Sequence, residues 1–216
     1  MGVLCDDFSK VVGSIGINEL KHPLFYNSPI GIRFEIGGDK IVYLDCEDSE
    51  KHIANPAYIS SAFDRANAIY KNLPCKPNIL RIDVYPDDNT MQKVIQMFCQ
   101  AGNIPTPHEQ VVKPFQWDED AETILQHQLY WNIEKIVFSP DRLLQEIIRA
   151  DIGGINAFAS NVYFADTHNV ILFHLYDDRG ADLVAADKEL LRPIYEKFNN
   201  WILDYDRETI DAIFAR

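Results

Sequence analysis

The stretch FHLYDDRGADLVAADKELLRPIYEKFNNWILDYDRE, residues 173–208, places strand-like segments, a turn and a helical pattern in direct succession. Asp177 and Asp178 followed by Arg179–Gly180 are typical of a turn, because Asp favours turn starts and Gly accepts a positive φ. The apolar residues on either side of the turn predict two adjacent strands. The stretch therefore predicts that the sheet ends in a β meander and that a helix follows it.

The helix after this meander has one apolar side. Its apolar residues recur every three or four positions, which predicts a helix that packs against the sheet. These residues are Leu190, Leu191, Ile194, Tyr195, Phe198, Trp201, Ile202 and Tyr205. Asp206 is expected to cap one more short helix, in which Ile210, Ile213 and Phe214 would be buried.

The segments before the quoted stretch add a hairpin and two strands. NVYFAD and VILFHLY flank a short turn at 167–169, which predicts a hairpin. IGIRFEIG (30–37) and ILRIDVY (79–85) alternate between apolar and polar residues, as strands with one buried face do.

Three more helices are predicted between and after these strands. Asn55–Pro56 is a good start for the first. The second, whose apolar residues are Met91, Val94, Ile95 and Phe98, is expected to be capped by Asp87 or Asp88 and to end at Gly102. Ser139–Pro140 begins the third, and Gly153–Gly154 is expected to end it.

Strands and helices in this order predict an α+β fold, with a mixed or antiparallel sheet, a C-terminal β meander and amphipathic helices that cover it. Residues 101–120 are rich in Pro, Gly and polar residues, and the end of segment 121–138, LYWNIEKIVF, is expected to be a strand. We therefore expect one α+β domain over residues 1–216, with a possible subdivision in the linker-like segment 101–120.

The charge balance restricts the possible partners. The chain has 216 residues, with 20 basic and 33 acidic side chains and a net charge of −13. Nucleic acids and anionic membrane surfaces attract clusters of Lys and Arg, so neither is an expected partner. An acidic protein is suited to a basic protein partner, although acidity by itself also serves solubility.

Cysteines and termini indicate the compartment. The four cysteines, at positions 5, 46, 75 and 99, form no CxxC pair for zinc or redox chemistry and are too sparse for a disulfide scaffold. The first ten residues contain acids where a signal peptide needs an apolar segment, and the chain has no apolar run of about 20 residues. We expect a cytoplasmic protein that needs no cofactor and no metal.

Two groups of polar residues could form a site. The first is the polar face of the two early strands, where Arg33 and Glu35 lie on one strand and Arg81 and Asp83 on the other. If the strands are neighbours, these side chains could form a pocket in which an arginine holds an anion and a carboxylate acts as a base. The alternative is a solvated sheet face with weak ion pairs.

The second group lies at the end of VILFHLY and in the turn after it. His174 and Tyr176 share one face, and Asp177, Asp178 and Arg179 follow. A histidine beside carboxylates could act as an acid–base catalyst, but a metal site usually needs at least three protein ligands. The alternative is that the two aspartates shape the turn through backbone hydrogen bonds while Arg179 or His174 pairs with them.

Three stretches resemble a bacterial family described as the domain of unknown function numbered 3885. They are HPLFYNSPIGIRFEIG (22–37), RANAIY (65–70) and LFHLYDDRGADLVAADKELLRPIYEKFNNWILDYDRETIDAIF (172–214). The resemblance implies a cytoplasmic protein of one α+β domain and imports no catalytic residue. Its motif stretches contain Arg33, Glu35, Tyr176, Asp178, Arg179, Trp201 and Asp206.

Two functions follow from these observations. The first is a non-enzymatic binding module, such as an immunity-type or inhibitor protein for a basic partner, with Arg33, Glu35, Asp83, Tyr176, Asp178 and Arg179 as the candidate binding residues. The alternative is a hydrolase-like enzyme that uses His174 and Asp178 at the meander turn, with Arg33 holding an anionic group of the substrate.

Overall fold

The computed structural model describes residues 2–44, 53–86, 90–117, 120–152 and 160–215. Its main element is a seven-stranded sheet with the strand order β1-β9-β8-β7-β4-β6-β5, in which every neighbouring pair is antiparallel. The strands are β1 (Gly31–Glu35), β4 (Ile79–Val84), β5 (Glu109–Phe115), β6 (Ile124–Asn132), β7 (Ser160–Asp166), β8 (Ile171–Leu175) and β9 (Gly180–Ala185). The predicted α+β fold and its C-terminal meander, β7-β8-β9, are confirmed.

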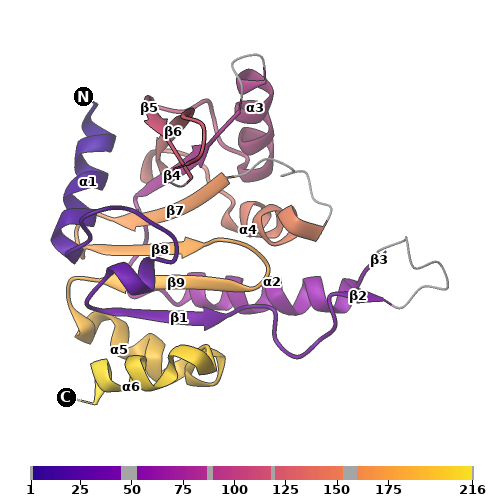
Figure 1. Cartoon of the computed structure of the whole chain (residues 1–216), viewed down its shortest axis with the longest axis vertical. Helices are drawn as coiled ribbons and strands as arrows, with labels where there is room; N and C mark the ends of the chain where they lie inside the picture. Colours follow the sequence, from indigo (N-terminus) through magenta and orange to yellow (C-terminus); the bar gives the residue numbers. More distant parts are fainter. Residues whose placement is uncertain (1, 45–52, 87–89, 118–119, 153–159, 216) are drawn as a thin grey trace.

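Helices cover this sheet on both faces and at the β1 edge (Figure 1). They are α1 (Val3–Ile15), α2 (Pro56–Lys71), α3 (Met91–Gly102), α4 (Pro140–Arg149), α5 (Lys188–Lys197) and α6 (Arg207–Phe214). A separate pair of short strands, β2 (Tyr43–Leu44) and β3 (Ile53–Ala54), projects away from the main sheet (Figure 1). The α2 start agrees with the prediction, since the Asn55 side chain accepts a hydrogen bond from the Ala57 amide.

The two faces of the sheet differ in composition. The face under α2, α3 and α4 carries the apolar alternate residues of every central strand, including Leu80, Phe164 and Phe173. The opposite face packs against α1, whose Phe8 ring contacts Tyr130 and Tyr163, and Val11 belongs to the same apolar cluster. This second face carries four buried ionisable side chains of the strands, Arg81, Asp83, His174 and Asp182.

The predicted long C-terminal helix is interrupted. Helix α5 ends at Lys197, and two 3₁₀ turns, Asn199–Trp201 and Asp204–Asp206, separate it from α6. Between them the chain is extended, because Leu203 donates its amide to the Arg33 carbonyl at 3.0 Å and Ile202 forms a bridge with Phe34. Pairing with the β1 edge thus replaces helical hydrogen bonds.

This interruption overturns the expectation for Tyr205, which is 86% exposed instead of packed on the sheet. Asp206 precedes α6, but its carboxylate makes no capping bond and turns to Tyr26 and Arg33.

Other boundaries also differ from the predictions. Gly102 is the last residue of α3, and Asn103, with φ 51°, adopts the left-handed conformation that was expected at the glycine. The proposed caps Asp87 and Asp88 and the proposed stop at Gly153–Gly154 lie outside the described residues, and α4 already ends at Arg149.

Helix α1 and strand β5 were not predicted. Strand β5 lies within the segment interpreted as a linker and pairs along its whole length with β6, so residues 109–115 belong to the main sheet. Strand β6 occupies 124–132 and stops before IEKIVF, which starts with a 3₁₀ turn. The described helices include none with both the length and the hydropathy to cross a bilayer. Cys5, Cys75 and Cys99 are free thiols.

Candidate functional site

A row of mostly ionisable side chains crosses the whole sheet on the α1 face, with one residue from each strand. Side chains at directly paired positions of neighbouring strands lie on the same face. From β1 to β5 the paired residues are Arg33, Asp182, His174, Tyr163, Arg81, Tyr130 and Glu109. The row places Arg33 near one edge and Arg81 in the middle of the sheet, and the two arginines have different surroundings.

Arg81 is closed off from solvent. Its Nε and Nη2 donate to the two carboxylate oxygens of Asp83 at 2.7 Å each, and both side chains are buried. The Phe8 ring of α1 covers the guanidinium at 4.9 Å, and Gln126 adds a longer hydrogen bond to Asp83. A bidentate pair with these partners satisfies the buried charges.

These contacts correct two expectations about the early strands. The polar face of 79–85 is not solvated, because α1 covers it. Strands β1 and β4 are also not neighbours, since β9, β8 and β7 lie between them. Arg33 and Glu35 therefore do not form a lattice with Arg81 and Asp83. Glu35 is exposed at the end of β1.

Arg33 sits at the open end of the row, and 18% of its side chain is exposed. Its Nε donates to the Tyr176 hydroxyl at 3.2 Å, and its Nη1 donates to Tyr26 at 2.9 Å and to Asp206 at 3.3 Å. Asp182 is 3.8 Å from Nε. Four residues distant from Arg33 or from one another in sequence thus surround one guanidinium. All of them, like Arg33, lie in the stretches 22–37 and 172–214 that resemble the family.

Asp182 is the residue that sequence reasoning missed. It is completely buried, and its Oδ2 accepts a hydrogen bond from the Phe25 amide at 3.2 Å. Burial raises its pKa to about 7, against the lowering effects of the Phe25 amide and Arg33. The signal was visible as a lone carboxylate inside the apolar strand ADLVAA, where a buried acid is unusual.

His174 is also completely buried, next to Asp182 in the row. Its ring contacts Tyr163 at 4.4 Å, Tyr176 at 5.5 Å and His22 at 5.6 Å between centroids. Neither ring nitrogen has a hydrogen-bond partner among the described residues, and burial lowers its pKa well below the usual value. A neutral, enclosed imidazole of this kind has no access to a substrate in solution.

Asp178 and Arg179 have separate partners. The Asp178 carboxylate accepts a hydrogen bond from Tyr58 of α2 at 2.5 Å, and burial raises its pKa. Arg179 donates to the Asp177 carboxylate through both Nε and Nη2, and the Arg179 amide donates to the same carboxylate at 2.7 Å. Asp177 therefore shapes the turn as the structural interpretation expected, and within the part of the chain that the structure describes no hydrogen bond joins His174 to Asp178.

The turn glycine has a different role from the predicted one. Among the described glycines only Gly16 and Gly38 have a positive φ, so Gly180 is not needed for that conformation. A Cβ atom at Gly180 would lie 2.1 Å from the Tyr176 hydroxyl. The absence of a side chain at 180 thus gives the Tyr176 ring the room to reach Arg33.

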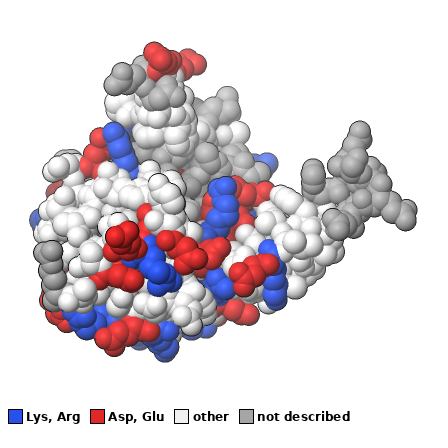
Figure 2. Space-filling model, turned by 60° about the horizontal axis from the view of Figure 1, so that its bottom comes forward, with Lys and Arg blue, Asp and Glu red and all other residues white. Residues whose placement is uncertain are grey.

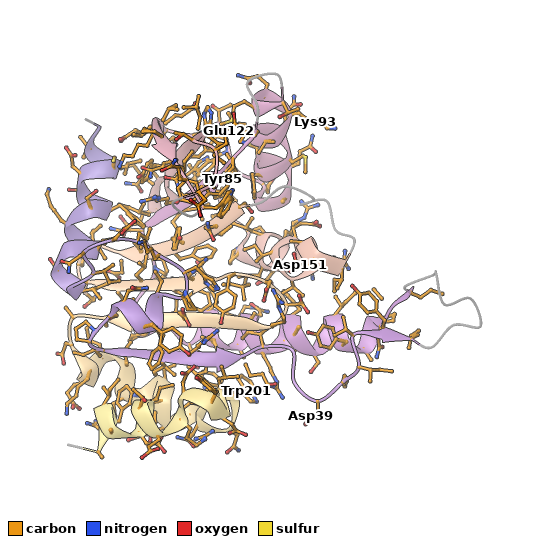
Figure 3. All side chains as sticks on the ribbon, in the orientation of Figure 1. Asp39, Tyr85, Lys93, Glu122, Asp151 and Trp201 are labelled. Carbon is orange, nitrogen blue, oxygen red and sulfur yellow. The ribbon has the colours of Figure 1, made fainter. Side chains whose placement is uncertain are left out.

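Oxygens of Asp151, Asp177 and Asp178 lie within 4.8 Å of one another, a spacing that a metal ion could use. The Arg179 guanidinium contacts Asp177 and also Asp151, at 3.4 Å, so it already supplies positive charge to this cluster. Figure 3 shows Asp151 beside the end of α4. Arg179 thus offsets part of the negative charge of these three carboxylates.

The exposed side of Arg33 opens into a cavity of about 340 Å³. Its polar lining comes from His22, Arg33, Tyr176, Asp177 and Arg179, and Phe34 and Leu203 add apolar contacts. Burial, and then the charge of Arg33, lower the pKa of His22, which packs on the Tyr176 ring at 4.3 Å between centroids. Of the predicted binding residues, the cavity brings together Arg33, Tyr176 and Arg179.

The comparisons with known proteins identify the class to which the chain belongs. Residues 12–206 match the model of the family described as Domain of unknown function (DUF3885), so the chain is a member of that family and the resemblance is confirmed. It is also similar to the Uncharacterized protein YnaE of Bacillus subtilis (strain 168), with 38% identity over 53 residues. That alignment covers 24% of this chain and 25% of the relative. No solved structure matches the chain.

Proposed function

We propose that the protein is a non-enzymatic binding module that covers a basic surface of a protein partner, in the manner of an inhibitor or immunity protein. The observation that carries this proposal is the surface formed by Tyr26, Asp204, Tyr205 and Glu208, which we call the Tyr205 surface. Its two tyrosines are 53% and 86% exposed, and the Asp204 side chain is 98% exposed.

The Tyr205 surface is held in place from below. The Tyr26 hydroxyl donates to Asp206 at 2.8 Å, and the Asp206 amide donates to the Leu203 carbonyl at 3.0 Å. Tyr205 is thus fixed on a turn instead of lying on a flexible tail. Because the backbone that carries Tyr205 is ordered before binding, only its side chain loses conformational entropy on contact, which favours its use as an anchor.

The chemistry of this surface suits lysine and arginine side chains. Tyrosine faces attract cations, and Asp204 and Glu208 add negative charge on either side of Tyr205. Arg207 lies 3.4 Å from Asp204 but also bonds to the carbonyls of Asn199 and Ile202. The net charge of −13 would speed the encounter with a basic partner.

The α5–α6 side of the molecule carries both acidic and basic side chains. Figure 2 turns the α5–α6 side of Figure 1 towards the viewer and shows Asp and Glu side chains among Lys and Arg side chains. Such a mixed surface favours recognition by pattern over adhesion to any cation. The hydrolase alternative remains a prediction without support from the contacts of His174 and Asp178.

The test is binding to lysine- and arginine-containing peptides, measured by fluorescence anisotropy over a range of salt concentrations. One variant combines Asp204→Asn, Tyr205→Ser and Glu208→Gln. The control combines Asp39→Asn and Glu134→Gln, two exposed acids elsewhere, and changes the net charge equally. We expect a loss of about tenfold or more in the first variant and little change in the control. Equal losses in both variants would reduce the effect to net charge and refute the proposed surface.

A further inference from the structure

The cavity beside Arg33 has the composition of a small-ligand site. Its volume of about 340 Å³ falls at the lower end of the range for small-molecule pockets. Two arginines, Tyr176 and His22 line it together with one carboxylate, Asp177, in a protein whose net charge is strongly negative. Whether these side chains can bind a ligand depends on which of their hydrogen-bond donors are not already used within the protein.

Arg33 has donor capacity to spare. An arginine carries five N–H donors, and the hydrogen bonds from Nε and Nη1 account for three of them. No hydrogen bond from Nη2 is found among the described residues. Tyr176, Tyr26 and Asp206 hold the guanidinium, so Nη2 has a fixed position although it makes no hydrogen bond within the described residues.

Tyr176 supplies a second donor next to Arg33. Its hydroxyl oxygen accepts from Arg33 Nε at 3.2 Å, which leaves the hydroxyl proton available for donation. Burial raises the pKa of Tyr176, so the phenol keeps this proton at neutral pH. The room over Gly180 and the His22 ring, which meets the Tyr176 ring edge-to-face, hold the phenol beside Arg33.

We propose that this cavity binds a small organic monocarboxylate, with Arg33 Nη2 and the Tyr176 hydroxyl as donors to its two oxygens. The body of the ligand would contact Leu203 and the faces of Tyr176 and His22. Charge decides between a monoanion and a dianion. Arg33 and Arg179 are offset by Asp206 and Asp177, so the local charge is near zero and a phosphate dianion would meet too little positive charge.

This inference is independent of the basic partner and is tested by titrating the ¹⁵N-labelled protein with sodium benzoate at constant ionic strength. Chemical-shift changes are followed by NMR. We expect saturable shifts for residues around 33 and 176–180, binding about tenfold weaker in Tyr176→Phe, and no saturable binding in Arg33→Gln. Arg192→Gln, an arginine of α5 paired with Glu189, is the matched control and should bind as wild type does.

Each outcome decides the proposal. Tyr176→Phe keeps the ring and remains informative if Arg33→Gln does not fold. Unsaturated or absent shifts in the wild-type protein would overturn the site, as would a Tyr176→Phe variant with unchanged affinity. Inorganic phosphate is titrated in parallel, and tighter binding of phosphate than of benzoate would overturn the choice of a monocarboxylate.

Discussion

Arg33 and Arg81 belong to the same row of side chains on one sheet face, yet their guanidinium groups differ in their partners and in their exposure to solvent. Arg81 has one dedicated carboxylate, Asp83, two residues away on its own strand, and is sealed by Phe8. Arg33 is bound by residues distant in sequence, among them Tyr176 and Asp206, and keeps one side open. The first arrangement is complete in itself, while the second leaves donors for another molecule.

Figure 3 labels Tyr85 and Trp201, which lie at opposite ends of the sheet. Tyr85, which lies near the β4–β6 end, bonds to Gln126 and Asn161 and extends the network around Asp83. Trp201 lies on the α5–α6 side, where its ring stacks on Phe198 and faces Arg65. The polar network at Arg81 thus extends through Asp83 and Gln126 to half-buried residues at this end of the sheet, Tyr85 and Asn161.

The largest effect is expected when the buried ion pair of Arg81 and Asp83 is broken. Asp83→Ala leaves the Arg81 charge buried without its partner, and we expect a loss of about 3–5 kcal/mol in the free energy of unfolding. Urea denaturation at neutral pH measures this. Replacing both residues together, as Arg81→Met and Asp83→Leu, should recover most of the loss, because no unpaired charge remains. A cost below about 1 kcal/mol for Asp83→Ala would show that water reaches Arg81 and that the two regions are alike.

The second effect concerns the Arg33 region and depends on pH. The pKa of Asp182 is about 7 in the folded protein and near the usual 3.8 when unfolded, so its stabilising contribution is complete below pH 3.8 and is lost as the pH rises to 7. Asp182→Asn imitates the neutral carboxyl group. We expect it to stabilise the protein at pH 8 by on the order of 2–4 kcal/mol and to have little effect at pH 4.

Urea denaturation of Asp182→Asn at pH 4 and pH 8 measures both changes in the free energy of unfolding. The control is an isosteric change at an exposed position of α2, Asp64→Asn. If Asp182→Asn were destabilising at pH 8 and not at pH 4, the carboxylate would be ionised and engaged by Arg33. The open region would then resemble the closed one.

The sequence accounts for much of the fold because its patterns are local. Alternation in 30–37 and 79–85 predicts β1 and β4, and the turn at 177–180 predicts the meander, as observed. Strand β5 was missed because Pro114 and neighbouring polar residues imitate a linker, although an edge strand tolerates them. The break after α5 was also hidden, because the spacing from Phe198 to Tyr205 continues the helical pattern while pairing with β1 interrupts it.

The site was harder to predict because it depends on strand order. Arg33 and Tyr176 were identified as candidates, but their contact requires β9 to lie between β1 and β8. The same order removes Asp83 from the group and brings in Asp182. Neither His22 nor Tyr26 has a sequence pattern that distinguishes it from a surface residue.

The third prediction tests the enclosure of His174. Because burial lowers its pKa, the contribution of this residue to stability is complete above pH 6.5 and is lost as the pH falls. His174→Phe removes two unpaired nitrogens from an aromatic environment. We expect a gain of about 1–3 kcal/mol at pH 5 and a smaller gain at pH 8, measured by urea denaturation. A destabilised variant would mean that the imidazole makes a hydrogen bond, through water or ligand, and would revive a chemical role for it.

The smallest effect on stability is expected in the Arg33 region, when Asp206 is replaced. Asp206→Ala removes a carboxylate from Arg33, but Tyr176, Tyr26 and Asp182 remain, so we expect a loss of only about 1 kcal/mol, well below that of Asp83→Ala. The charge of Asp206 also contributes to the raised pKa of Asp182. The variant should therefore lower the pH at which Asp182 titrates, as followed by ¹³C NMR of its carboxyl carbon. An unchanged midpoint combined with a loss as large as that of Asp83→Ala would mean that Asp206 acts as a dedicated partner of Arg33, and the distinction between the Arg33 and Arg81 regions would disappear.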